Sequence, residues 1–339
     1  MLIPLLLAIV VIFIAWKQSC MLPQFERSRY LTTYAGSPRN DDTIFVSVAS
    51  YRDSDCSKTI NDMFAKAKHP RKVFVGIVQQ NKPGFTLETC SYPVRYRENI
   101  RKITMDYQEA RGPCFARQIA TSLYKGEHFF MQIDSHTTFA DNWDEKIKTM
   151  WKAKENPRAV FSHYPKDMES KNTTNVPVNC NSRLGTDGMP MFYAVELKPN
   201  DRRRTYFIGA GFLFGHGQML FDVPFDPELD MLFQGEEVLY SARLYTHGYD
   251  VFAPSENIVY HYYGREDQPH FWNDISDPEL YRVVKKQSED KVKNMLDVKS
   301  RESVSGFGFG TKRSLSSFFE VSGLSMSDND VTFSHCYST

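Results

Sequence analysis

The chain has 339 residues with 41 basic and 41 acidic side chains, so its formal charge is balanced. A balanced charge argues against a nucleic-acid-binding protein, which is expected to carry a basic surface. The six cysteines form no C-x-x-C pair, which disfavours a zinc ribbon, and at this length disulfides are permitted but not required.

The N-terminal segment differs from the rest of the chain, because residues 2–16 are apolar and uncharged. This run is slightly shorter than the roughly 20 residues usual for a membrane span, but flanking residues and bilayer thinning can cover the deficit. We therefore predict a membrane anchor at 1–16, with a cleaved signal peptide as the alternative, and a polar stem at 17–42. Basic residues after the anchor favour a cytosolic body, whereas a glycosylation sequon at 172–174 favours the ER or Golgi lumen, so the membrane side stays open.

The folded body is predicted to span residues 43–323 and to open with a strand at 44–48. This strand runs into Ser50-Tyr51-Arg52-Asp53, and a helix at about 57–68 and an apolar run at 73–78 follow. Strand, helix and strand within about 30 residues indicate a βαβ unit and hence a parallel sheet. The polar turn can hold a nucleotide base and ribose, or it is an ordinary turn in which an aspartate caps the helix.

Further along, Pro113 is well placed at the first position of a helix. Arg117 lies near the start of that helix and can point toward the end of the next strand. That strand is the apolar run 128–133, which ends abruptly in Asp134-Ser135-His136. Ligands of open α/β sheets bind at the carboxyl ends of the strands, and an oxygen and a nitrogen ligand two residues apart suit a divalent cation such as manganese. A D-x-H tripeptide also arises by chance.

An amphipathic helix is predicted at 142–154 and a short strand at 159–163. Residues 166–200 are long, poor in pattern and rich in Asn, Pro, Gly and Ser. Because a loop of that length in a compact domain is usually functional or disordered, we predict an insertion over the active face. An apolar strand at 205–215 then carries Gly209-Ala210-Gly211, and glycines inside a strand mark a bulge or a close approach by a ligand or another backbone.

Two carboxylates, Glu236 and Glu237, follow Gly235 and open the next predicted helix. Acidic residues in a first turn are also explained by the helix dipole alone. The last predicted strand, near 258–265, carries His261 and Arg265, although a lone strand histidine is more often structural than a ligand. Residues 324–339 are predicted to be partly disordered. No P-loop or dinucleotide-binding glycine motif follows any predicted strand.

The combination and order of these segments resemble one family. The motifs that carry the resemblance are A-S-Y-R-D, A-R-G-P-C-F-A-R, Q-I-D-S-H-T-T-F-A-D-N-W-D, G-A-G-F-L-F-G, the G-E-E helix and H-Y-Y-G-R. Together with a tail element at 308–315, they look like the polypeptide α-N-acetylglucosaminyltransferases, which attach GlcNAc to hydroxyproline or threonine. The resemblance covers about residues 43–325. The mucin-type polypeptide GalNAc-transferases are more distantly similar.

The resemblance implies an α/β fold of the GT-A nucleotide-diphospho-sugar transferase type, with a mostly parallel central sheet and helices on both faces. It implies UDP-GlcNAc as donor, manganese as the cation, a polypeptide acceptor, and Asp134, His136 and His261 as metal ligands. The implied donor-binding residues are Ser50, Tyr51, Arg52, Asp53, Arg117, Asp134, Ser135, Gly209, Ala210, Gly211 and Arg265. Glu236 and Glu237 are implied to face the donor sugar as catalytic residues.

The family retains configuration, so the resemblance implies an α-linked product. In one mechanism the acceptor hydroxyl attacks on the face that UDP leaves, and in the other Glu237 is a nucleophile. Where the mucin-type enzymes have G-G-E-N this chain has Gln234-Gly235-Glu236-Glu237, so the choice of sugar cannot be copied from them. Two alternatives remain: a GT-A transferase that extends a glycan or glycolipid, and a non-catalytic sugar- or protein-binding module.

Overall fold

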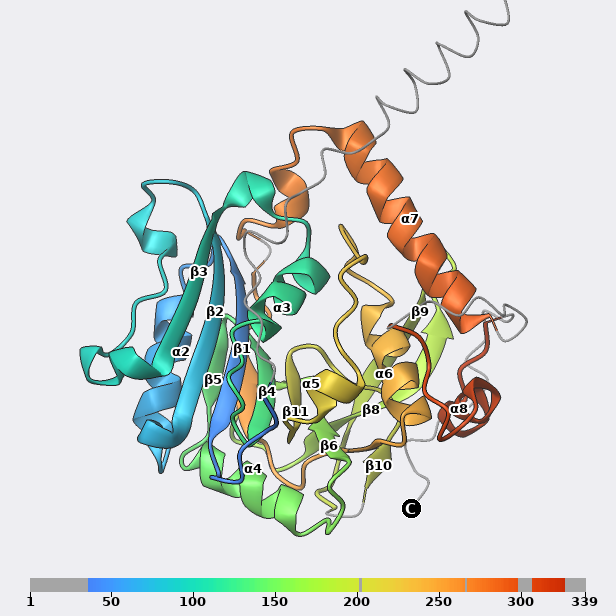
Figure 1. The fold of residues 1–339 in the computed structure, drawn as a ribbon, viewed down its shortest axis with the longest axis horizontal. Coiled ribbons are helices and arrows are strands. Elements are labelled where there is room, and N and C mark those ends of the chain that lie inside the picture. The colour runs from blue at the N-terminus through green and yellow to red at the C-terminus, as the bar shows by residue number, and fades with distance from the viewer. Residues whose placement is uncertain (1–35, 201–202, 266, 298–306, 327–339) are drawn as a thin grey trace, which may run out of the picture. The chain divides into compact units, whose positions relative to one another are not determined.

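The computed structural model describes residues 36–200, 203–265, 267–297 and 307–326. It confirms the predicted architecture, because helices cover both faces of a large, mostly parallel sheet (Figure 1). The strand order is β10-β12-β6-β11-β4-β1-β2-β3. The strands are β1 (Ile44–Tyr51), β2 (Val73–Asn81), β3 (Ile100–Asp106), β4 (Phe129–Asp134), β6 (Ala159–Ser162), β10 (Arg204–Thr205), β11 (Phe212–His216) and β12 (Asp250–Phe252).

The directions of the strands bring several chain segments to one edge. β1 is parallel to both β2 and β4, β2 is parallel to β3, and β12 is parallel to β6. β11 runs antiparallel between β4 and β6 and begins opposite the end of β4, with Phe212 paired with Ile133. The carboxyl ends of β1 and β4 and the amino end of β11 therefore meet at the same edge of the sheet.

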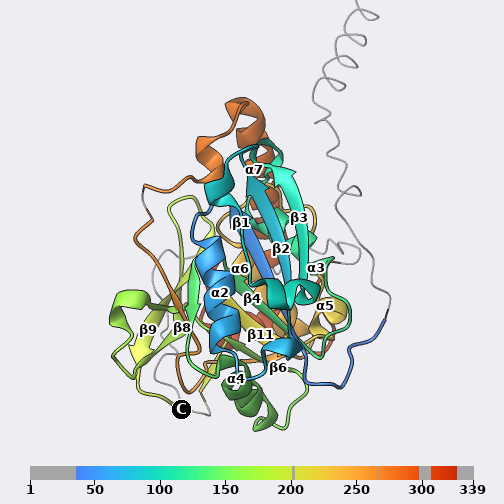
Figure 2. The same ribbon diagram turned by 90° about the vertical axis from the view of Figure 1, so that its left-hand side faces the viewer.

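Alternating residues along the central strands supply the two apolar faces. Ile44 and Val46 of β1 pack with α2 (Cys56–Lys66) and α4 (Trp143–Lys152), whereas Phe45 packs on the opposite face. That face is covered by α3 (Pro113–Thr121), α5 (Met219–Asp222) and α6 (Glu236–Thr246). Figure 2 shows α2 on one side of β1 and β2, and α3 and α5 on the other.

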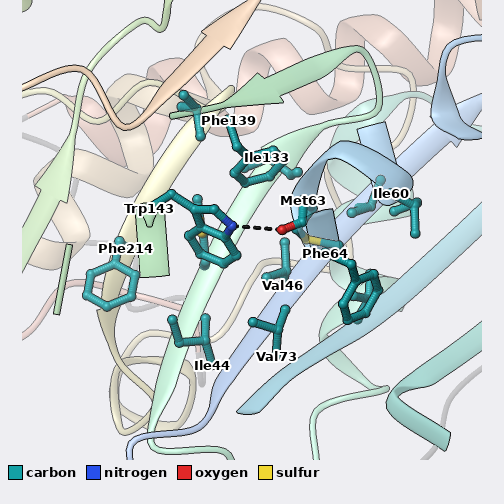
Figure 3. Packing of buried hydrophobic residues seen from close by; sticks show 14 of the residues in the cluster. Ile44, Val46, Ile60, Met63, Phe64, Val73, Ile133, Phe139, Trp143 and Phe214 are labelled. Atoms are coloured by element: carbon teal, nitrogen blue, oxygen red, sulfur yellow. Dashed lines mark hydrogen bonds between the residues drawn. The ribbon is translucent and has the colours of Figure 1, made fainter. Parts of the chain in front are cut away.

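One buried indole ties the α2–α4 face together. Trp143 is fully buried, and its Nε1–H donates to the carbonyl oxygen of Met63 at 2.9 Å, which links α4 to α2 (Figure 3). Its ring packs in the same cluster as Val46 of β1 and Ile133 of β4. Burying a large apolar side chain contributes about 1.5–3 kcal/mol, so this cluster anchors the strands that end at the site.

A second, smaller sheet has the order β5-β13-β7. Its strands are β5 (Thr137–Phe139), β13 (Val259–His261) and β7 (Lys166–Asp167). β13 pairs antiparallel with β5, so that His261 lies opposite Thr137. The N–H of Tyr262 donates to the carbonyl of His136 at 3.2 Å. This register places two histidines that are far apart in the sequence side by side.

Three segments differ from the sequence predictions. Residues 166–200, predicted to be an irregular insertion, contain β7 and the hairpin of β8 (Val176–Leu184) and β9 (Pro190–Leu197). The predicted strand 205–215 is split into β10 and β11. Two helices were not anticipated, α7 (Pro278–Leu296) and α8 (Leu315–Ser322); together with α6 they build an apolar cluster.

The prediction of a single-pass membrane protein is contradicted. Within the described residues, the structure has no helix that is both long and apolar enough to cross a bilayer. The segment predicted as the anchor, 1–16, lies outside the described residues. Most of the predicted stem at 17–42 and of the tail at 324–339 also lies outside them.

Candidate active site

Three side chains with metal-ligating atoms converge where β4 ends. Asp134 is the last residue of β4, His136 follows it, and His261 ends β13. One ligand atom from each lies within 4.8 Å of the others. The Asp134 Oδ2 and the His261 Nε2 are 3.3 Å apart. One carboxylate oxygen and two imidazole nitrogens suit a divalent transition metal, and manganese as the particular metal stays a prediction.

The buried carboxylate of Asp53, in the turn after β1, holds this group in place. Its Oδ2 accepts from the Ser135 Oγ at 2.6 Å and lies 2.8 Å from the His136 Nδ1. Its Oδ1 accepts from the Arg265 Nη1 at 3.1 Å and from the Asp55 N–H at 2.9 Å. Burial by itself would raise the pKa of Asp53, but His136, Arg265 and Ser135 outweigh it and lower that pKa to about 2. An imidazole that donates from Nδ1 keeps its Nε2 lone pair for a cation.

Arg117 of α3 fixes the other side of the group. Its Nη2 lies 3.3 Å from the Asp134 Oδ1 and its Nη1 donates to the Glu236 Oε2 at 2.8 Å. Burial would raise the pKa of Asp134, yet His261 and Arg117 hold it well below its usual range. Asp134 is therefore ionised and available as an anionic ligand.

The small-residue motif forms a tight turn before β11 and lies against the same carboxylate. The Phe212 N–H donates to the Gly209 carbonyl at 3.2 Å, and the Ala210 carbonyl accepts from the Gln132 Nε2 at 2.8 Å. A Cβ on Gly211 would lie 3.1 Å from the Asp134 Oδ2, and one on Gly209 would lie 2.9 Å from a backbone oxygen. Gly209 and Gly211 thus each lie in close contact with neighbouring protein groups.

Glu237, in the first turn of α6, reaches back to this turn. Its Oε1 accepts from the Ala210 N–H at 2.7 Å and its Oε2 accepts from the Tyr164 hydroxyl at 2.6 Å. Burial raises the pKa of Glu237 to about 7, even though Ala210, Tyr164 and Arg117 favour the ionised form. A carboxyl group with this pKa can change its protonation state near neutral pH.

Most of these groups line one pocket of about 520 Å³, among them the three candidate metal ligands, Arg117 and Glu237. Its far wall carries apolar and aromatic side chains from the segment before α6 and from the segment after β13, namely Phe233, Pro269, His270, Phe271 and Trp272. Phe233 and Trp272 make an edge-to-face contact at 5.3 Å between ring centroids, and each is exposed. Pockets of this size that combine an apolar wall with convergent polar groups are typical of small-molecule sites.

The structure brings most of the predicted site residues to this pocket. Those that line it are Tyr51, Asp53, Arg117, Asp134, Ser135, His136, Ala210, Gly211, Glu237, His261 and Arg265. Four others do not line it: Ser50, Arg52, Gly209 and Glu236. Ser50 is fully buried. Arg52 pairs with Glu88 at 3.0 Å and with Asp274 at 2.7 Å.

Among the polar residues at or beside the pocket that the sequence analysis did not predict are Tyr164 and Asp274. Tyr164 follows the buried strand β6 at the same sheet edge, which is the signal that could have found it. Asp274 accepts from the Tyr51 hydroxyl and from the Arg52 Nη1, both at 2.7 Å. It ties the segment that carries Trp272 to the turn after β1. No sequence pattern marks Asp274, because its partners lie more than two hundred residues away.

The mostly parallel sheet with helices on both faces and a site at its strand ends has the fold of the GT-A glycosyltransferases. The chain belongs to the glycosyltransferase (GlcNAc) family, whose model matches residues 43–94 and 86–328. The chain is therefore a glycosyltransferase.

The chain is similar to solved structures. GalNAc-T7 with UDP, GalNAc and Mn²⁺ is similar at a TM-score of 0.50 and 15% identity, over 83% of this chain and 55% of that one. S. aureus TarS 1–349 in complex with UDP-GlcNAc is similar at a TM-score of 0.47 and 14% identity, over 74% of this chain and 70% of that one. No curated protein sequence matches the chain.

Proposed function

We propose that this protein is a metal-dependent, retaining glycosyltransferase that moves GlcNAc from UDP-GlcNAc to a hydroxyl group of a polypeptide. The observation that carries the proposal is the convergence of Asp134, His136 and His261, whose ligand atoms lie within 4.8 Å of one another in the wall of the pocket. The description of the family names GlcNAc. The solved structure of GalNAc-T7, which has the same fold, contains UDP and Mn²⁺.

Different residues around the pocket would bind different parts of the donor. Asp134, His136 and His261 would hold the cation, which when bound neutralises charge on the leaving diphosphate. The Arg265 guanidinium, 3.1 Å from Asp53 and 3.4 Å from Asp55, keeps further N–H groups for a phosphate oxygen. The ring of Tyr51 lines the pocket wall at the end of β1, where a uridine is expected.

For the chemical step we propose attack from the face that UDP leaves. The acceptor hydroxyl oxygen forms the new bond to C1 as the C1–oxygen bond to the diphosphate breaks, and the departing phosphate oxygen takes the hydroxyl proton. Configuration is retained and no protein nucleophile is needed. The contacts of Glu237 support this mechanism, because both of its carboxylate oxygens already accept hydrogen bonds from protein donors.

The rival mechanism makes Glu237 a nucleophile in a double displacement. The variant Glu237→Gln separates the two mechanisms. Front-face attack predicts that kcat at saturating donor stays within about tenfold of wild type while the donor KM rises, because only a donor contact is lost. Complete loss of kcat with donor binding intact would instead support the nucleophile.

The acceptor is proposed to be hydroxyproline, threonine or serine in a polypeptide, on the strength of the motif resemblance. The exposed rings of Phe233 and Trp272 at the pocket wall offer an apolar surface beside the expected position of C1. A product assay with peptide and with sugar acceptors tests this part of the proposal. Transfer to sugars alone would make the protein a glycan-extending enzyme.

The decisive experiment is a panel of UDP-sugars assayed for hydrolysis with manganese and with EDTA. The proposal expects release of UDP from UDP-GlcNAc that requires manganese. Full activity in EDTA would refute the metal site, preference for another UDP-sugar would refute the donor, and inactivity with every donor would favour a binding module.

A further inference from the structure

Tyr164 is the one described residue whose side-chain hydroxyl donates to the Glu237 carboxylate. The phenol lies in the pocket wall, at 2.6 Å from the Glu237 Oε2, while the Ala210 N–H takes the Oε1 at 2.7 Å. Burial and the neighbouring Glu237 carboxylate raise the pKa of Tyr164 far above its ordinary value, so the phenol keeps its proton and donates.

The ring of Tyr164 is held from several sides. Its backbone N–H donates to the Asn179 Oδ1 of β8 at 3.0 Å. The ring stacks on Phe192 of β9 at 4.9 Å between centroids with an interplanar angle of 13°. A Cβ on Gly209 would lie 2.9 Å from the Tyr164 Cδ1, so the glycine makes room for the ring. The hairpin β8–β9 therefore sets where the phenol points.

We propose that Tyr164 is a positioning residue that keeps the Glu237 carboxylate turned into the pocket and ionised, as the acceptor for a hydroxyl group of the bound donor sugar. This inference rests on the proposed function. It also assigns a role to the hairpin β8–β9. Asn179 and Phe192 of this hairpin fix the position of Tyr164, whose hydroxyl in turn fixes the Glu237 carboxylate.

The charged and titratable groups that face Glu237 come from four elements. Arg117 of α3 favours its ionised form, whereas Glu236 of α6 opposes it. Tyr263, after β13, also lies within electrostatic reach of Glu237. Burial raises the pKa of Glu237 to about 7, and the Tyr164 hydrogen bond lowers it. Removing the phenol hydroxyl alone must therefore move this pKa upward.

The test is the pH profile of kcat/KM for donor hydrolysis in wild type and in Tyr164→Phe, which keeps the ring and its stacking. If ionised Glu237 is needed, activity falls as the pH drops through its pKa, near pH 7 in wild type. In Tyr164→Phe we expect this acid limb to move up by about one pH unit, since a hydrogen bond to a charged group is worth about that much. Activity should recover at high pH.

A matched control is Tyr193→Phe, because Tyr193 lies exposed on β9 outside the pocket wall. This variant also loses one phenol hydroxyl, and its pH profile of kcat/KM should superimpose on that of wild type. Carbon-13 carboxyl shifts of labelled glutamate give a readout that does not depend on turnover. In Glu237→Gln the resonance that titrates near pH 7 should disappear, which assigns it, and in Tyr164→Phe it should titrate at higher pH.

The outcomes separate this inference from the proposed function. An active wild type, with a Tyr164→Phe profile lowered equally at every pH and an unmoved glutamate resonance, would overturn the inference alone. An enzyme inactive with every UDP-sugar would overturn the proposed function and this inference with it.

Discussion

The variant Asp53→Asn tests how the metal site is oriented, because an amide replaces one carboxylate oxygen by a donor. The Asp53 Oδ1 receives two obligate donors, the Arg265 Nη1 at 3.1 Å and the Asp55 N–H at 2.9 Å, so the amide oxygen must stay on that side. The amide NH₂ then faces His136, whose Nδ1 lies 2.8 Å from the Asp53 Oδ2. That Nδ1 must become an acceptor, which leaves the proton on Nε2 and removes the lone pair from the cation site.

We expect Asp53→Asn to weaken manganese binding by about 10–100-fold, the usual effect of losing the partner of a ligating histidine. Lost hydrogen bonds to the buried charge should also lower the free energy of unfolding by about 1.5–3 kcal/mol. Manganese binding is measured by electron paramagnetic resonance of the free ion, and unfolding by urea titration. Asp55→Asn is the matched control, because it removes the same charge two residues away without touching His136. Equal manganese affinities in Asp53→Asn and wild type would refute the reasoning.

Three further predictions concern the metal ligands, the glycine turn before β11 and the buried core. Asp134→Asn and His261→Ala should each abolish manganese-dependent donor hydrolysis while the circular dichroism spectrum is kept, and activity that survives either change would remove the metal assignment. Gly211→Ala places a methyl group 3.1 Å from the Asp134 Oδ2, so hydrolysis should fall by at least about tenfold with little change in the unfolding midpoint; an unchanged rate would mean that the turn yields freely. Trp143→Ala should lower the free energy of unfolding by about 3–5 kcal/mol, measured in urea, and a loss below about 1 kcal/mol would show that the core repacks around the cavity.

Much of the scaffold was predictable because its strands are short apolar runs with polar ends. The predicted helix at about 57–68 is observed at Cys56–Lys66, and the predicted strand at 128–133 is observed at Phe129–Asp134. In both cases the local pattern and the tertiary environment favour the same structure. The hairpin β8–β9 was missed because Asn and Pro interrupt an apolar alternation of Val176, Val178 and Cys180, all of which are buried.

Of the three candidate metal ligands, only His261 was identified solely through the family resemblance. A single histidine in a strand carries no signal of its own. The structure gives the physical reason for its place, which is the pairing of His261 with Thr137 in the small sheet. Such a pairing depends on the register of two strands that are distant in the sequence. Ser50 and Arg52 belong to a predicted donor-binding motif, yet neither lines the pocket. Adjacency in a motif does not decide which side chains turn into the pocket.

Each reactive group of the site is held by a residue from another element. This arrangement explains why the sequence predicts the reactive groups better than the residues that orient them. His136 is oriented by Asp53 from the turn after β1, and Glu237 is held by Tyr164 from the end of β6. A positioning residue needs one hydrogen bond in the right direction and no particular neighbours in the chain, so it leaves no motif. The ligands and carboxylates can thus be read from motifs, whereas the pKa and tautomer that make them useful depend on contacts between elements. The chemistry of this site is therefore a property of how β1, β4, β6 and α6 meet at one sheet edge.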